Sequence, residues 1–210
     1  MVYEEKPKTV YWLDNSLYLN ITNRCSNDCW FCFRNFKQGV GGFNLKLERE
    51  PTTAEVKAAL EAAFAMRRWG EVVFCGFGEP TARLDVLLEV VKWIRERCGG
   101  LVPIRVDTNG QGCALNKGRD VARELRDAGV SGVSVSLNGH DEASYAENCR
   151  PTCGGGFTAV LEFVRKAKIA RLDLEVSAVM MPEVDVKKVR AVAELLGVPL
   201  RVRDYIPCFW

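Results

Sequence analysis

The sequence predicts an α/β protein in which six strands and five helices form an open, partial (β/α)6 barrel. Short apolar runs rich in β-branched residues alternate with segments of helical period, a pattern typical of parallel β/α units. Six such runs occur, whereas a closed barrel of this type needs eight strands. The chain has 210 residues, of which 48% are hydrophobic, and this is enough for one domain with a sizeable core.

The strands follow from runs of Val, Ile, Leu and Phe that are bounded by polar or glycine-containing turns. We expect strands at residues 17–22, 71–75, 104–108, 132–137, 172–180 and 198–204. Residues 17–210 then form the core domain, and residues 1–16 are expected to be an N-terminal extension.

The helices follow from apolar residues that recur every three to four positions. We expect them at about residues 53–69, 118–128, 157–170 and 186–196, with one more that begins near Leu84 and stops at Gly99. Thr52 and Glu55 are spaced as a capping box at the start of the first helix. Gly99, Gly129 and Gly197 follow three of the helices, where glycine suits a left-handed cap.

Three cysteines, Cys25, Cys29 and Cys32, follow the first expected strand with the spacing Cys-x3-Cys-x2-Cys. In parallel β/α folds the functional groups lie in loops at the carboxyl ends of the strands, so this loop belongs to the expected active rim. Three thiolates can hold an iron–sulfur cubane and leave one iron free to bind a further ligand. The alternatives are a zinc site or three reduced core thiols. Zinc prefers four N or S ligands, and the single histidine, His140, is distant in sequence.

A second motif, Cys75-Gly-Phe-Gly-Glu-Pro-Thr81, leaves the second expected strand. Gly76 and Gly78 allow the backbone to approach a ligand closely, and Glu79 adds a carboxylate. A turn before a helix is the alternative interpretation of this segment. Because it lies on the same rim as the cysteines, we interpret the two motifs together as one site.

Polar side chains also end the next two strands. Asp107, Thr108 and Asn109 close the third strand, and Ser136 and Asn138 close the fourth. Both asparagines are followed by glycine, which is a strong signal for a tight turn, so a simple turn is the alternative to a ligand contact.

The cysteine motif and the segment 76–80 together resemble those of the radical S-adenosylmethionine (SAM) superfamily, which implies that the partial barrel is a radical SAM core. From residue 17 to residue 207 the chain further resembles one branch, the TatD-associated radical SAM proteins. The segments that carry this closer match are residues 19–25, 44–51, 72–80, 149–151 and 201–205. One departure is Phe77, which stands where the superfamily pattern has a glycine.

The resemblance implies two cofactors, a [4Fe–4S] cluster held by Cys25, Cys29 and Cys32, and SAM. The segment 76–79 would hold the amino group of SAM, the polar ends of the third and fourth strands its ribose or carboxylate, and Met180 would border its adenine. By resemblance, the cofactor-binding residues are therefore Phe31, Gly76, Phe77, Gly78, Glu79, Asp107, Thr108, Asn109, Ser136, Asn138 and Met180.

The implied reaction is reductive cleavage of SAM to methionine and a 5′-deoxyadenosyl radical, which abstracts hydrogen from a substrate; no catalytic side chain is assigned. The electron donor would be of the flavodoxin or ferredoxin type. Because the chain ends soon after the last expected strand, we expect a sizeable substrate, protein or peptide ahead of a small molecule, to close the barrel mouth. The alternative is a non-catalytic iron–sulfur or metal-binding scaffold that docks a partner such as a TatD-like nuclease.

Composition bears on partners and location. The 29 basic and 27 acidic residues give a net charge of +2, which favours neither nucleic acid nor a membrane as partner. No signal peptide or transmembrane segment is visible near the N-terminus, so the expected location is the cytoplasm. Four cysteines in segments after later strands are expected to bind a second cluster, to form disulfides or to do neither: Cys113, Cys149, Cys153 and Cys208.

Overall fold

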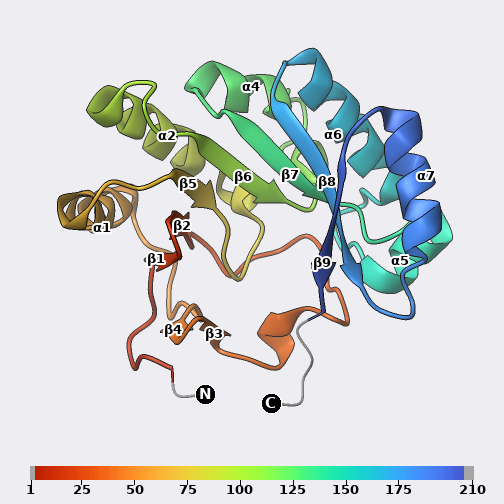
Figure 1. Ribbon diagram of the computed structural model, residues 1–210, viewed down its shortest axis with the longest axis horizontal. Coiled ribbons are helices and arrows are strands. Elements are labelled where there is room, and N and C mark those ends of the chain that lie inside the picture. Colours follow the sequence, from red (N-terminus) through yellow and green to blue (C-terminus); the bar gives the residue numbers. More distant parts are fainter. Residues whose placement is uncertain (1–2, 206–210) are drawn as a thin grey trace.

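The computed structural model describes residues 3–205 and contains a seven-stranded mixed sheet that curls into a half-barrel, with helices along its outer side (Figure 1). Six strands run parallel, in the order of the chain: β2 (Ser16–Leu19), β5 (Glu71–Phe74), β6 (Ile104–Thr108), β7 (Gly132–Ser136), β8 (Asp173–Met180) and β9 (Leu200–Asp204). All six fall on the expected strands, so the predicted open α/β barrel is confirmed.

The edge strand β1 (Val10–Leu13) is absent from the prediction. It pairs antiparallel with β2, and Asp14 and Asn15 form the two-residue turn between the two strands. Asp14 takes a positive φ of 51°, a conformation that Asp and Asn adopt more readily than most residues. Because β1 lies within residues 1–16, part of the segment expected to be an extension completes the sheet.

The five predicted helices are present as α1 (Thr53–Met66), α2 (Leu84–Cys98), α4 (Val121–Ala128), α6 (Phe157–Ile169) and α7 (Val186–Leu196). Helix α1 ends before residue 69 because Arg67 is extended, and α4 begins later than expected because the Asp120 side chain caps it. The loops hold smaller elements that were not predicted: α3 (Gly112–Leu115), α5 (Glu142–Cys149), the 3-10 helices η1 (Phe33–Asn35) and η2 (Pro80–Arg83), and a hairpin of β3 (Gly39–Val40) and β4 (Phe43–Asn44). Across residues 3–205, none of the helices combines the length and the apolar character that crossing a membrane requires.

The helix ends follow the predicted chemistry in all but one case. Thr52 and Glu55 form the capping box of α1, since the Thr52 hydroxyl accepts from Glu55 N and the Glu55 carboxylate accepts from Thr52 N. Gly129 and Gly197 are left-handed caps, with φ of 110° and 63°. The left-handed cap expected at Gly99 is wrong, because its ψ of −143° turns the chain into an extended path instead.

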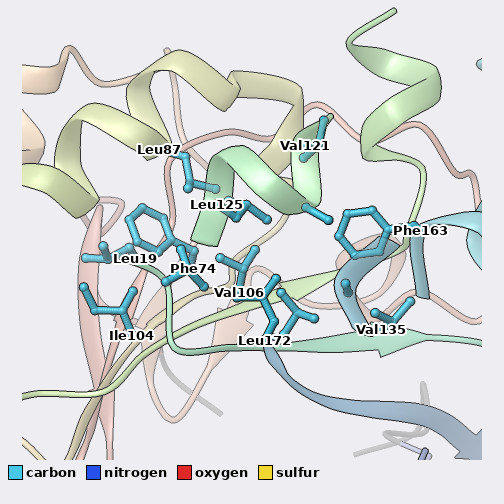
Figure 2. Packing of buried hydrophobic residues seen from close by; sticks show 14 of the residues in the cluster. Leu19, Phe74, Leu87, Ile104, Val106, Val121, Leu125, Val135, Phe163 and Leu172 are labelled. Carbon is cyan, nitrogen blue, oxygen red and sulfur yellow. The ribbon is translucent and has the colours of Figure 1, made fainter. Parts of the chain in front are cut away.

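The core lies between the outer face of the sheet and the helices. Figure 2 shows strand residues and helix residues that meet there, among them Phe74, Val106, Val135, Leu87, Leu125 and Phe163. On β6, Arg105 alternates with buried residues and therefore lies on the opposite, concave face. Its guanidinium is 2.9 Å from Asp107 Oδ1 and 3.3 Å from Glu71 Oε2. Charged side chains therefore lie on this part of the concave face. This face is not filled by the apolar core, and a ligand can bind inside the half-barrel.

Candidate functional site

One cavity of about 630 Å³ lies at the carboxyl ends of the parallel strands. It brings together almost all of the residues singled out in the sequence: Cys25, Cys29, Phe31, Cys32, Gly76, Phe77, Gly78, Glu79, Asp107, Thr108, Asn109, Ser136 and Asn138. Met180 is the exception, because it is 56% exposed and does not border this cavity. The structure therefore gathers the expected site on one rim but leaves the proposed adenine neighbour outside it.

The loop that carries the three cysteines leaves β2 and is held by hydrogen bonds with residues 150–152, just beyond α5. Asp28 N donates to Arg150 O at 3.1 Å, and Thr152 N donates to Ser26 O at 2.8 Å. An isolated antiparallel bridge joins Asn27 to the chain beyond α5 as well. These backbone contacts fix the cysteine loop against a segment more than a hundred residues away.

The three thiols differ in electrostatic environment. Burial, with the nearby Glu79 charge, raises the pKa of the Cys25 thiol to about 12, and burial also raises the pKa of Cys32. A hydrogen bond with the Cys149 thiol lowers the pKa of Cys29. Cys25 and Cys32 are therefore protonated at neutral pH, and metal binding there must release their protons.

The donor set fits an iron–sulfur cluster better than a single ion. Three thiols border one cavity, and Cys25 Sγ accepts from Asn27 N at 3.4 Å and lies 3.6 Å from Asn109 Nδ2, contacts of the kind that tune cluster potentials. Between residues 3 and 205, no three His, Cys, Asp or Glu side chains are placed to hold one metal ion.

The Gly76–Glu79 loop lies directly against the cysteine loop. A Cβ on Gly78 would lie 2.3 Å from Arg24 O, and one on Gly76 would lie 2.2 Å from Asn20 Oδ1, so both glycines are required by close approach of backbone and side chain. The Phe77 ring is 7% exposed and contacts Phe33 edge to face at 5.4 Å between centroids. Because this ring packs within a small apolar cluster, phenylalanine is accommodated where the superfamily pattern has glycine.

Glu79 is 3% exposed and joins two loops of the rim. Its Oε1 accepts from Thr108 Oγ1 at 2.8 Å and from Thr81 N at 3.0 Å, and its Oε2 accepts from Asn109 N at 2.7 Å. Burial raises the pKa of this carboxyl in spite of these hydrogen bonds. Glu79 therefore positions the loop after β6, in addition to bordering the cavity.

The wall of the cavity formed by β9 is missing from the sequence-based site. Residues 201–205 border the cavity, and within them Arg203 Nη2 donates to Ser136 Oγ at 3.4 Å, while Arg201 Nη1 lies 3.7 Å from Glu175 Oε1. The available signal was the pair of arginines two residues apart at the end of the last expected strand, which places both on one face.

The remaining cysteines do not form a second group. Cys149 is 1% exposed and neighbours Cys29, whereas Cys113 lies in a separate surface groove beside α6. Cys153 Sγ is 4.0 Å from Gln111 Oε1, and all eight cysteines within residues 3–205 are free thiols. Cys75, the first residue of the second motif, also borders the main cavity. Cys208 lies outside the described residues.

A half-barrel with a three-thiol loop after its first parallel strand, packed against a glycine-containing loop that borders the same cavity, is the arrangement of a cluster-dependent α/β enzyme. The sequence profile of the radical SAM superfamily matches residues 19–196. The chain therefore belongs to the radical SAM superfamily, whose members are enzymes that use a [4Fe–4S] cluster and SAM.

The individual proteins that the chain resembles in sequence carry different names. The chain is 29% identical over 197 residues to a "Probable GTP 3′,8-cyclase" of Methanococcus maripaludis, covering 91% of this chain and 59% of that protein. It is 31% identical over 143 residues to an Fe-coproporphyrin III synthase of Methanosarcina barkeri, covering 67% of this chain and 30% of that one. The chain spans about half the length of the relatives it matches.

Solved structures share the fold at low sequence identity. Streptococcus suis SuiB bound to the precursor peptide SuiA has a TM-score of 0.69 at 15% identity, covering 94% of this chain and 40% of that one. Native anSMEcpe with bound AdoMet has a TM-score of 0.67 at 16% identity, covering 90% of this chain and 50% of that one.

Proposed function

We propose that Cys25, Cys29 and Cys32 hold the [4Fe–4S] cluster of this enzyme and that the surrounding rim binds SAM beside it. The observation that carries the proposal is the single cavity, in which the three thiols lie together with the Gly76–Glu79 loop and the polar ends of β6 and β7.

When bound, the reduced cluster supplies the electron that cleaves SAM to methionine and a 5′-deoxyadenosyl radical. The protein provides binding, orientation and exclusion of water. Phe31 is 8% exposed and, together with Phe33, borders the cavity beside Cys32, so these rings keep water from the thiols. Glu79, through Thr108 and Asn109, fixes the loop after β6, and Asp107, Ser136 and Asn138 offer polar atoms to the nucleoside and carboxylate.

For the substrate, we propose a protein or peptide. Arg201–Asp204 of β9 and the following Tyr205 border the cavity, and among residues 3–205 the one sheet neighbour of β9 is β8, so the cavity lies at a sheet edge where an extended chain has access. Two proteins with the same fold, SuiB and anSMEcpe, have been solved with peptides bound. A small molecule is the second candidate, favoured by the relatives named GTP 3′,8-cyclase.

The branch of the superfamily, the electron donor and a competing function complete the proposal. We place the chain in the TatD-associated branch on its motifs, and we propose an electron donor of the flavodoxin or ferredoxin type. A non-catalytic scaffold that docks a TatD-like nuclease is the competing function, and SAM cleavage separates the two.

The test is anaerobic reconstitution with iron and sulfide, reduction, addition of SAM and measurement of 5′-deoxyadenosine. We expect product from the wild type and none from variants in which Cys25, Cys29 or Cys32 is alanine. Cys98→Ala is the matched control, because Cys98 ends α2 and does not border the cavity. Loss of product in the control as well, or full activity in a ligand variant, would contradict the assignment. If GTP increases the formation of 5′-deoxyadenosine and peptide fractions do not, the result would favour the small-molecule candidate.

A further inference from the structure

The hydroxyl of Tyr145 lies at a junction of three segments of the site. Tyr145 is in α5, is 0% exposed, and its hydroxyl accepts from Asn27 Nδ2 at 2.9 Å and from Gln111 Nε2 at 3.1 Å. It also lies 3.5 Å from Asn109 O. A buried phenol hydroxyl is costly unless it is hydrogen-bonded, and here its partners are in the cysteine loop and the loop after β6, with a further contact to the Cys149 thiol of its own helix.

Asn27 lies between Cys25 and Cys29 in the sequence and contacts both of their thiols. Its backbone N donates to Cys25 Sγ at 3.4 Å, and its side chain contacts the Cys29 thiol. Within residues 3–205, the buried Oδ1 of Asn27 has no hydrogen-bond partner. The orientation of the amide therefore depends on its Nδ2, which donates to the Tyr145 hydroxyl.

The other partners extend the same junction to the rim. Asn109 Nδ2 donates to Ser26 Oγ at 2.8 Å and lies 3.6 Å from Cys25 Sγ. Gln111 Nε2 also donates to Gly156 O at 2.8 Å, and its Oε1 accepts from Gly156 N at 3.1 Å. One hydroxyl therefore couples the cysteine loop, the loop after β6 and the start of α6.

We propose that Tyr145 is a positioning residue for the cluster: through Asn27 it fixes the cysteine loop in the conformation that presents Cys25 and Cys29 together. The inference rests on the proposed role of the three cysteines. Replacing the hydroxyl by hydrogen removes the oxygen acceptor of Asn27 Nδ2, whereas Gln111 Nε2 keeps Gly156 O, so the strain falls on the cysteine loop.

The experiment compares Tyr145→Phe with Tyr11→Phe after anaerobic reconstitution. Tyr11 is a matched control because it is 2% exposed and its hydroxyl donates to Cys75 O at 3.2 Å, outside the cysteine loop. The measurements are the rate at which a chelator removes iron and the electron paramagnetic resonance spectrum of the reduced cluster with and without SAM. We expect Tyr145→Phe to release iron roughly tenfold faster than the wild type and to shift the spectrum. Tyr11→Phe, which alters a hydrogen bond outside the cysteine loop, should release iron at the wild-type rate.

A double-mutant cycle with Asn27→Ala separates positioning from general loss of stability. If Tyr145 acts through Asn27, the double variant releases iron no faster than Asn27→Ala alone. Equal release in Tyr145→Phe and the wild type, or multiplicative effects of the two substitutions, would overturn the inference. Should Tyr145→Phe fail to fold, Asn27→Ala still decides, because release at the wild-type rate from that variant would also refute it. Failure of the wild type itself to load a cluster would instead count against the proposed function.

Discussion

Gly78→Ala offers a direct test of how closely the two loops of the site must approach. The added Cβ would lie 2.3 Å from Arg24 O and 2.6 Å from Thr22 O, whereas ordinary contact begins at 3.4 Å. Gly78 is not among the glycines with positive φ, so the conflict is steric and not conformational. Since both facing atoms are backbone, the loops must separate by about 1 Å to restore ordinary contact.

The magnitude follows from this separation. Overpacking costs about 1–3 kcal/mol, and stretching the 2.8 Å hydrogen bond from Glu79 N to Arg24 O adds about 1 kcal/mol, so the free energy of unfolding should fall by about 2–4 kcal/mol. In a chain of this length the melting temperature should drop by roughly 10 °C. A displacement of this size at reacting groups lowers rates on the order of 100-fold, which is the loss we expect in 5′-deoxyadenosine formation.

The assay combines thermal unfolding of the apoprotein with the anaerobic cleavage reaction. Gly100→Ala is the matched control, because its Cβ would meet nothing within 4 Å and its φ is not positive. Wild-type melting and cleavage in Gly78→Ala would refute the argument that backbone proximity makes this glycine necessary. A loss of stability with unchanged cleavage per folded protein would refute its functional part.

Two further predictions concern the scaffold. Hydrogen bonds from Arg49 and Thr52 lower the pKa of Glu55 to about 2, so this carboxylate stabilises the fold above its unfolded pKa and the contribution is lost as pH falls. Denaturant titrations between about pH 5 and pH 2 should therefore show a smaller loss of stability in Glu55→Gln than in the wild type, and equal losses would contradict the shift. Phe163→Ala should lower the free energy of unfolding by about 3–5 kcal/mol, because the ring is 0% exposed, with cluster content per folded protein unchanged; a loss below about 1 kcal/mol would mean that the core closes around the deletion.

The parallel strands were predictable because their signal is local. Strand β5 is a short apolar run, and β6 and β7 alternate apolar with polar residues; both patterns are visible without knowledge of the partner strands. Strand β1 was missed although Asp14 and Asn15 between two apolar runs are a hairpin signal, because the segment was interpreted as an extension. Helix α5 was missed because it has few apolar positions and its capping box pairs Asp141 with Ser144 instead of with an acidic residue.

The site, like the fold, has one part that local sequence patterns reveal and another that depends on contacts between distant segments. Its cysteines and glycines are recognisable because their spacing within one loop carries the chemistry. The network that orients them is invisible in the sequence, since Asn27 meets Tyr145 across 118 residues and Cys25 meets Asn109 across 84. A buried tyrosine in a short helix gives no local sign that its hydroxyl supports a loop so far away. Met180 is exposed and does not border the cavity, because strand polarity gives its rim position but not its exposure.

The backbone contacts between the cysteine loop and the chain beyond α5 have a consequence for the order of assembly. Ser26 O accepts from Thr152 Oγ1 across 126 residues, so this restraint on the loop exists only when the chain beyond α5 is in place. Iron inserted on the nascent chain would meet three cysteines on an unrestrained loop. If the three cysteines hold a cluster as proposed, a cluster delivered to the folded apoprotein would instead meet a loop already held by residues 150–152.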